Sequence, residues 1–267
     1  MPLFQFIYFL FRMRSDNFWL IWITLLAIVM RLGRLYFDPL FWRDCILYIQ
    51  MAQQWFERGS YIGVLDCDRN ASWIPPMSIF LIQALMHIGV SVEVAARLLT
   101  IIFGCSIPII GYLISKVICR NRYIALCSAL FFAVNPVLVD YSIQPTREVF
   151  YLVWCGLTLL FICKGIRYRN EKNWISSGCF CAVASLTRYE SFELLIYVIL
   201  YFSIATFIMK QYTFVMALKH CMLFFLAFFG VFILISFLSG TYRVIYDNYY
   251  SYLSNSDKIK AIRVIYR

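Results

Sequence analysis

A single carboxylate, Asp44, stands at the start of a predicted surface helix that follows directly on a long apolar run. It shares a helical face with Tyr48, Met51 and Trp55, on the side that would point toward the membrane. A carboxylate in that position is costly unless it caps the helix, pairs with an arginine or faces a wet cavity. The chemistry that it could perform is proton abstraction, as a base held at the membrane surface beside a lipid-borne substrate.

The helix that carries Asp44 is predicted to be amphipathic and to lie in the membrane interface. Tyrosine and tryptophan on its apolar side suit this depth. An ordinary N-cap role for Asp44 is the alternative, because an aspartate at a helix start accepts hydrogen bonds from backbone N–H groups. The apolar positions are Cys45, Tyr48, Ile49, Ala52, Trp55 and Phe56, and the polar positions are Gln50, Gln53, Gln54, Glu57 and Arg58.

A pair of acidic residues, Asp66 and Asp68, occurs in the stretch LDCDRN. Such spacing can hold a divalent metal, and the alternative is a polar loop whose acids pair with Arg58 or Arg69. The chain has only two histidines and no C-x-x-C pair, which argues against zinc or haem. We therefore expect no cofactor, with a divalent metal at Asp66 and Asp68 as the alternative.

The composition of the 267-residue chain indicates an integral membrane protein, because 63% of its residues are hydrophobic and only 14% are charged. A soluble domain carries about a quarter charged residues. The net charge of +10 could indicate nucleic-acid binding, but lysines and arginines of cytoplasmic loops explain it better. We expect no nucleic-acid partner. Most of the cysteines lie inside apolar runs, where they act as small hydrophobic residues and form no disulfide framework.

The apolar stretches predict an all-α polytopic membrane protein with about seven transmembrane helices. The segment 74–89 is shorter and begins with two prolines, so it is predicted to be re-entrant or interfacial rather than a full span. It would be the second of two interfacial helices in the first extracytoplasmic loop. The predicted spans are 17–37, 95–117, 123–139, 149–163, 174–187, 192–209 and 214–238.

The distribution of basic residues predicts the orientation of these spans. With the N-terminus in the cytoplasm, the short outer loops hold only Arg147 and Arg188. This topology divides the chain into a cytoplasmic or interfacial segment 1–16, a transmembrane module 17–238 with its extracytoplasmic loop 38–93, and an extracytoplasmic tail 239–267. The inner loops hold Lys116, Arg120, Arg122, Lys164, Arg167, Arg169, Lys172, Lys210 and Lys219.

Four stretches, in this order, resemble the GT-C glycosyltransferases, in the branch of the protein mannosyltransferases and aminoarabinose lipid A transferases. The resemblance covers about 31–209. Members of that branch are usually longer and often have an acid where this chain has Cys45, so the chain looks like a short or truncated member. The matching positions are Asp44, Tyr48 and Ala52; Pro75, Pro76, Gly89, Ala96, Arg97 and Leu98; Pro136, Tyr141, Ser142, Thr146 and Glu148; and Leu186, Thr187, Arg188 and Glu190.

The resemblance implies transfer of a sugar from a polyprenyl-phosphate donor to an extracytoplasmic glycan, lipid or protein. Asp44 would be the base of a single, inverting displacement. The departing phosphate needs cations, and the planar fork of arginine matches its oxygens, which favours Arg188 first. The alternatives are snorkelling for the arginines and a helix-dipole role for Glu148. The substrate-binding candidates are Arg43, Tyr48, Arg97, Tyr141, Arg147, Glu148, Arg188 and Glu190.

Two other functions remain open on the sequence. One is a non-catalytic module that binds a polyprenyl lipid or a partner subunit. The other is a transporter of lipid-linked sugars, which would need internal pseudo-repeats or charges at mid-membrane, and the sequence shows neither. The short loops favour a bacterial inner membrane, with the endoplasmic reticulum membrane as the alternative.

Overall fold

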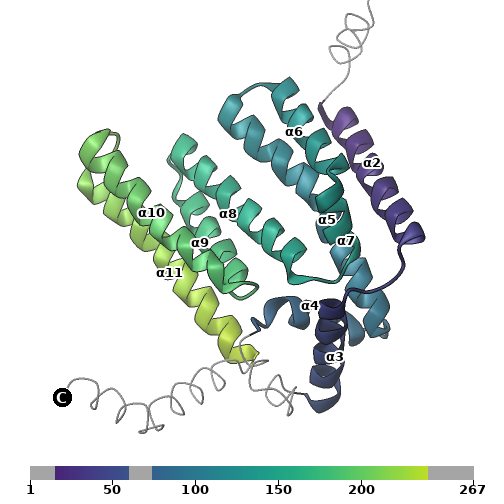
Figure 1. Cartoon of the computed structure of the whole chain (residues 1–267). Coiled ribbons are helices and arrows are strands. Elements are labelled where there is room, and N and C mark those ends of the chain that lie inside the picture. Colours follow the sequence, from purple (N-terminus) through teal and green to yellow (C-terminus); the bar gives the residue numbers. More distant parts are fainter. Residues whose placement is uncertain (1–15, 60–73, 240–267) are drawn as a thin grey trace, which may run out of the picture.

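The computed structural model describes residues 16–59 and 74–239, and every regular element in these two ranges is helical. Figure 1 shows the longer helices side by side as a bundle, with α3 and α4 at one end of it. In chain order the elements are α2 (Asp16–Phe37), α3 (Arg43–Arg58), α4 (Met77–Met86), α5 (Val92–Cys119), α6 (Arg122–Val134), α7 (Pro136–Ile143), α8 (Arg147–Tyr168), α9 (Glu171–Ser185), the 3-10 helix η2 (Tyr189–Phe192), α10 (Glu193–Ser203), the π-helical turn η3 (Ile204–Ile208) and α11 (Phe214–Leu238).

Five stretches of the described chain are helical, long and apolar enough to cross a membrane. They are α2, α5, α8, the run Tyr189–Ile208 formed by η2, α10 and η3, and α11. These correspond to the first, second, fourth, sixth and seventh predicted spans. Large apolar side chains point outward along them, as in α11, where Leu226 is 66% exposed. Such a surface is typical of a multi-pass membrane protein, whose outward side chains meet lipid.

The third predicted span, 123–139, is broken. α6 ends at Val134, α7 begins at Pro136, and the two helices are bent by 54°. Proline has no N–H to donate and disfavours helical backbone in the residue before it, so Asn135 takes up extended angles. The Asn135 side chain then caps α7 by accepting a hydrogen bond from the Leu138 N–H at 3.2 Å. The bent pair counts as at most one further span.

The fifth predicted span, 174–187, corresponds to α9, which has 15 residues. A helix needs about 20 residues to cross the hydrocarbon, so α9 is too short to be counted as one. Among the described residues five stretches, or six with the bent pair, have the length and composition of a span, so the predicted number of about seven is not confirmed. α9 packs between α8 and α11. Small residues allow this close approach: a Cβ added at Gly178 would lie 2.2 Å from the Phe224 carbonyl oxygen.

A fully buried arginine, which the sequence reading did not single out, connects α2 to the break between α6 and α7. The Nη1 atom of Arg31 donates to the carbonyl oxygens of Ala27 at 3.0 Å and Ala133 at 3.3 Å. Ala133 lies in the last turn of α6, where carbonyls lack an intrahelical partner. Arg31 thus satisfies a backbone acceptor at the end of the broken helix.

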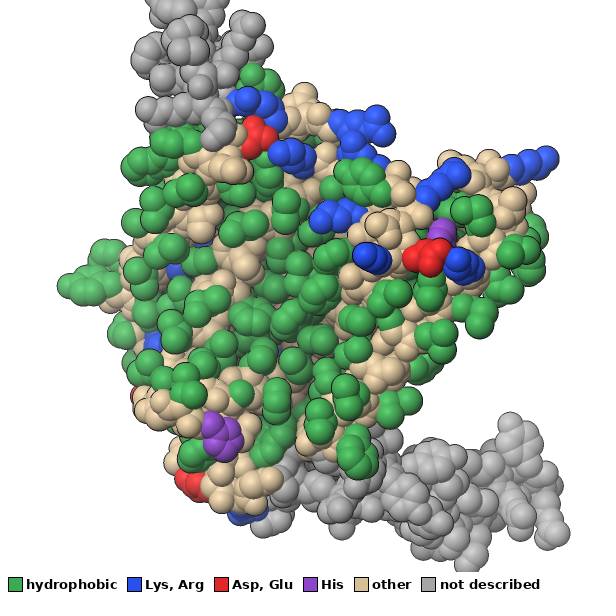
Figure 2. Space-filling model, turned by 180° about the vertical axis from the view of Figure 1, so that it is seen from behind, with side chains coloured by type: hydrophobic (Ala, Val, Ile, Leu, Met, Phe, Trp, Pro, Cys, Tyr) green, Lys and Arg blue, Asp and Glu red, His purple; other side chains and the backbone are tan. Residues whose placement is uncertain are grey.

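The two ends of the bundle differ in charge. Lysines and arginines gather at one end, called here the basic end, as Figure 2 shows. The opposite end, called the site end, is formed by α3, α4 and the ends of α7, α8 and α9 that meet them (Figure 1). In the described residues the basic end carries Lys116, Arg120, Arg122, Lys164, Arg167, Arg169, Lys172, Lys210 and Lys219, together with the acids Asp16 and Glu171.

Candidate active site

The predicted amphipathic helix exists as α3, and protein covers most of its apolar side. Tyr48, Ile49, Ala52 and Trp55 are buried in one cluster that α4 and the start of α5 complete. Phe56 departs from the pattern, since it is 38% exposed. α4 is a short apolar helix of 10 residues, as the predicted segment 74–89 requires. The apolar side of α3 therefore contacts other helices of the same chain.

Asp44 lies in the first turn of α3, and its side chain is exposed. Trp42 occupies the N-cap position and makes no side-chain cap hydrogen bond, so the N-cap alternative for Asp44 is wrong. A carboxylate in the first turn is still favoured by the helix dipole. Asp44 forms no hydrogen bond or ion pair with the side chains that the structure describes, which leaves its oxygens open to solvent.

Gln144, in the connection between α7 and α8, fixes the chain that leads into α3. Its side chain is fully buried. Its Nε2 donates to the Leu40 carbonyl at 2.9 Å, and its Oε1 accepts from the Trp42 N–H at 3.2 Å and the Cys45 thiol at 3.5 Å. Sequence reasoning missed this residue. The only signal was a polar side chain between two apolar helices, with nothing to identify a partner so far away along the chain.

Arg188 connects three elements at the site end. Its Nη1 lies 3.4 Å from Glu148 Oε1 at the start of α8, and its Nη2 lies 2.7 Å from Glu190 Oε1 in η2. The guanidinium also stands 5.5 Å from the centre of the Tyr151 ring. The hydrogen bond to Glu190 raises the pKa of Arg188, against the effect of burial, so the guanidinium stays charged. Three of the predicted substrate-binding candidates, Arg188, Glu148 and Glu190, therefore lie together.

The turn that carries Arg188 also touches α4. The backbone N–H of Met77, at the start of α4, donates to the Leu186 carbonyl at 3.0 Å. α4 in turn packs against α3 and α5. This chain of contacts links the end of α9 to the helix that bears Asp44.

The Tyr48 hydroxyl is affected by charged side chains of both α3 and α8. Burial raises the pKa of its hydroxyl, Glu148 and Asp44 raise it further, and Arg147 lowers it. The buried Cys45 thiol has a pKa raised to about 11, first by desolvation and then by the charges of Asp44 and Glu148. Groups from both helices therefore act on the same buried positions. The site cluster consists of Asp44, Tyr48, Arg147, Glu148, Arg188 and Glu190.

Arg97 and Tyr141 support the segment before α3 rather than joining this cluster. Arg97 Nη2 donates to the Pro39 carbonyl, and its guanidinium lies 4.0 Å from the centre of the Phe41 ring. The Tyr141 ring meets Trp42 edge to face, with 5.7 Å between ring centroids. Both residues thus hold the chain that enters the helix of Asp44.

The structure does not describe the side chains of the remaining predicted site residues. Arg43 begins α3, and its side chain lies outside what the structure describes. Asp66 and Asp68, the alternative metal ligands, fall outside the described ranges, as do all but one residue of each predicted terminal segment, 1–16 and 239–267. Within the described ranges no group of three or more His, Cys, Asp or Glu residues could hold a metal ion.

Several guanidinium donors at the site end are buried without a partner among the described residues. They are Nε of Arg147, Nε of Arg188 and Nη1 of Arg97. A buried N–H that is left unsatisfied costs about 1–3 kcal/mol, and more when the group is charged. An anion such as a phosphate would supply the missing hydrogen-bond acceptors, because its oxygens match the geometry of the guanidinium group.

Comparison with known proteins identifies a family. The sequence model of the family described as dolichyl-phosphate-mannose-protein mannosyltransferase matches residues 74–236. The matched stretch contains Arg97, Arg147, Glu148, Arg188 and Glu190, and it begins after α3. No curated protein and no solved structure matches the chain.

Proposed function

We propose that this chain, which belongs to the dolichyl-phosphate-mannose-protein mannosyltransferase family, transfers a sugar. The sugar would move from a polyprenyl-phosphate donor to an acceptor at the site end. Membership of the family makes it a membrane glycosyltransferase of the GT-C type. The donor, the acceptor and the roles of individual residues belong to the proposal. The acceptor is an extracytoplasmic glycan, lipid or protein.

Asp44 is the proposed base. Its carboxylate is exposed and has no ion-pair partner among the described side chains, so it is free to accept a proton from an acceptor hydroxyl. The acceptor oxygen forms a bond to the anomeric carbon while the bond from that carbon to the donor phosphate breaks. The proton passes to Asp44, and the electron pair leaves with the polyprenyl phosphate. One displacement of this kind inverts the anomeric centre.

Arg147 and Arg188 are the proposed phosphate ligands, with different roles. Arg188 already pairs with Glu148 and Glu190, which balance its charge, while its Nε has no partner among the described residues. Arg147 forms no ion pair with any residue that the structure describes, and its charge reaches the Tyr48 hydroxyl. We therefore assign the main contact with the phosphate to Arg147. Arg188 would order Glu148, which with Tyr48 is placed to meet sugar hydroxyls.

The observation that carries the proposal is the convergence on Tyr48 of Asp44 from α3 with Arg147 and Glu148 from α8. A base and a cation at the same end of the bundle are what a displacement at a sugar phosphate requires. The polyprenyl tail would stay in the membrane while the phosphate and sugar reach this end of the bundle.

The test is mass spectrometry of cell-envelope glycans and glycolipids from the host. Deletion of the gene, complementation with wild type, and complementation with Asp44→Asn are compared, and protein levels are checked by blot. Loss of one sugar mass in the deletion and in Asp44→Asn, with restoration by wild type, supports the transferase and identifies the sugar. Glu57→Gln is the matched control, because Glu57 is an exposed acid of the same helix that bonds to Gln53.

Full restoration by Asp44→Asn would overturn the role of Asp44 as base. A deletion that changes no glycan would argue against the transferase and for a non-catalytic lipid-binding module. A lipid-linked sugar that accumulates on one side of the membrane in the deletion would instead indicate transport.

A further inference from the structure

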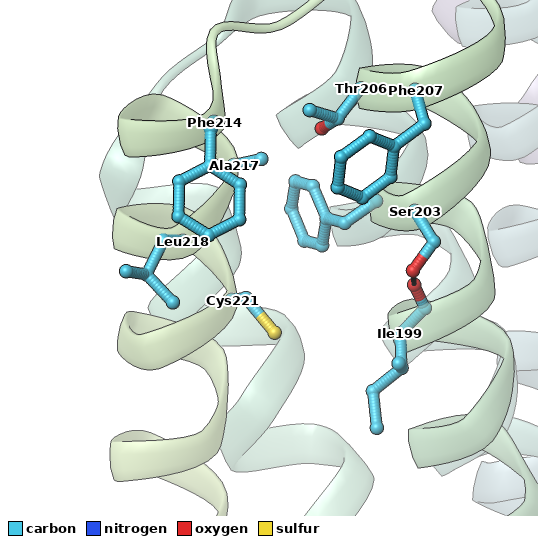
Figure 3. Close-up of a pocket in the computed structure, with 9 residues that line it drawn as sticks. Ile199, Ser203, Thr206, Phe207, Phe214, Ala217, Leu218 and Cys221 are labelled. Carbon is cyan, nitrogen blue, oxygen red and sulfur yellow. Dashed lines mark hydrogen bonds between the residues drawn. The ribbon is translucent and has the colours of Figure 1, made fainter.

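A small apolar pocket lies between the run Tyr189–Ile208 and α11, at their basic ends. Its volume is about 130 Å³. The buried side chains of Phe202 and Ala217 form its floor. Phe207 and Phe214 flank it on the exposed side, with ring centroids 6.4 Å apart (Figure 3). Since Phe207 and Phe214 are 69% and 61% exposed, the pocket opens on the outer surface of the bundle, where lipid lies.

The pocket is bounded by an irregular stretch of backbone. η3 is a single π-helical turn, a feature that is rare and often occurs at functional sites. It is followed by the connection 209–213, which joins the two walls of the pocket. Lys210 in this connection has φ 53°, in the left-handed region that favours glycine. Lys210 is exposed and makes no hydrogen bond or ion pair with the residues that the structure describes.

A second cation is held against the same connection. Arg169 also has a left-handed backbone, with φ 50°, and its Nη2 donates to the Gln211 carbonyl at 3.2 Å. Its guanidinium lies 5.3 Å from the centre of the Tyr212 ring. Two basic residues in strained backbone therefore meet at one connection. A glycine would adopt this backbone at a lower conformational cost, and these two residues instead place positive charge beside the connection.

We propose that this pocket and the connection 209–213 form a binding site for an anionic phospholipid. One acyl chain would enter the apolar pocket, and the headgroup phosphate would lie beside Lys210 and Arg169. The excess of cations over acids at the basic end supplies the complementary charge. Each lysine or arginine near an anionic membrane surface contributes about 1 kcal/mol to such binding. This site lies at the opposite end of the bundle from the site cluster and is independent of the proposed transferase activity.

The test uses the full chain in neutral detergent and native mass spectrometry. The fraction of protein with bound lipid is measured during titration with phosphatidylglycerol and, separately, with phosphatidylcholine. We expect wild type to bind the anionic lipid more tightly. Lys210→Gly relaxes the backbone and removes the charge, so it is expected to weaken phosphatidylglycerol binding about fivefold without lowering the midpoint of thermal unfolding.

Arg120→Gly is the matched control, because Arg120 is another exposed cation of the basic end with a left-handed backbone, φ 55°, in the connection between α5 and α6. Its binding of phosphatidylglycerol is expected to stay within about twofold of wild type. Equal weakening by Lys210→Gly and Arg120→Gly would show general attraction to the basic end and overturn the site. Equal binding of the two lipids by wild type would also overturn it.

A second variant tests the pocket itself. Ser203 is exposed and lines the pocket. Its hydroxyl donates a hydrogen bond to the Ile199 carbonyl of the same helix at 2.9 Å (Figure 3). Ser203→Leu would fill part of the volume with a larger side chain while leaving every cation in place. We expect weaker binding of phosphatidylglycerol. If this variant binds phosphatidylglycerol as tightly as wild type, the acyl chain does not occupy the pocket and the proposal is overturned.

Discussion

The side-chain oxygen of Gln144 accepts a hydrogen bond at 3.2 Å from the backbone N–H of Trp42, 102 residues earlier in the chain. With the bond from Gln144 Nε2 to the Leu40 carbonyl, it holds the segment that leads into the helix of Asp44. A buried glutamine that bonds both a backbone N–H and a backbone carbonyl is hard to replace, because each lost bond leaves a polar group without a partner.

We expect Gln144→Met to reduce both stability and sugar transfer. Methionine keeps the length of the side chain but offers neither the donor nor the acceptor. The loss of stability should be about 1–3 kcal/mol. The midpoint of thermal unfolding in detergent and the yield of glycosylated product measure the two effects. Gln50→Met, at an exposed position of α3, is the control, and equal behaviour of the two variants would contradict the positioning role.

Arg188→Lys should lower product formation on the order of tenfold, although the charge is kept. A lysine is a point charge and cannot reach both Glu148 and Glu190 with the geometry of a guanidinium fork. The control is Arg34→Lys, because Arg34 also pairs with two acids, Asp38 and Asp140, but on the exposed surface of α2 and α7. Exposed pairs contribute about 0–1 kcal/mol, so Arg34→Lys should retain activity. A fully active Arg188→Lys would show that one cation of any shape suffices.

Gly178→Ala should destabilise the contact between α9 and α11. The added Cβ would lie 2.2 Å from the carbonyl oxygen of Phe224, which is backbone and cannot turn aside. Overpacking of this kind costs roughly 1–3 kcal/mol. Gly230→Ala, in α11, places its Cβ in open space and should be neutral or stabilising. Thermal unfolding of the two purified variants compares them, and equal midpoints would mean that α9 and α11 are farther apart than described.

The Cys45 thiol should resist alkylation at pH 8. With its pKa raised to about 11 from the ordinary 9.0, roughly one thiol in a thousand is ionised there, instead of about one in ten. The thiolate fraction, and so the rate, should rise about tenfold per pH step until pH approaches 11. Peptide mass spectrometry after maleimide treatment measures this, with the exposed Cys119 as internal reference. Labelling of Cys45 as fast as that of Cys119 would contradict its burial.

The sequence predicted the elements whose signal is local. α11 was predicted at its observed ends, because an uninterrupted apolar run bounded by polar residues leaves one way to place a helix. The buried side of α3 followed from helical spacing, since the positions that recur every three or four residues share a face. The resemblance singled out Glu148, Arg188 and Glu190 as substrate-binding candidates, and the structure brings these three side chains together.

The features that were missed depend on partners distant in sequence or on small changes in length. The apolar run 123–139 reads as one span, although the Asn135–Pro136 step within it carries the local signal for a break. α9 falls a few residues short of a span, which hydrophobicity alone does not reveal. The roles of Arg31 and Gln144 depend on backbone groups about a hundred residues away, and no local pattern identifies these.

The bond from Arg31 to Ala133 also connects the membrane insertion of this chain to the order in which it is synthesised. Ala133 leaves the ribosome 102 residues after Arg31, and until then Arg31 has, of these two acceptors, only the Ala27 carbonyl in its own helix. Arg31 lies six residues before the end of α2, and a charged side chain in a lone transmembrane helix is costly to insert into lipid. Stable release of α2 from the insertion machinery into lipid is therefore expected to wait for α5 and α6. α2 would then be synthesised before these two helices but reach its stable position in the lipid only after them.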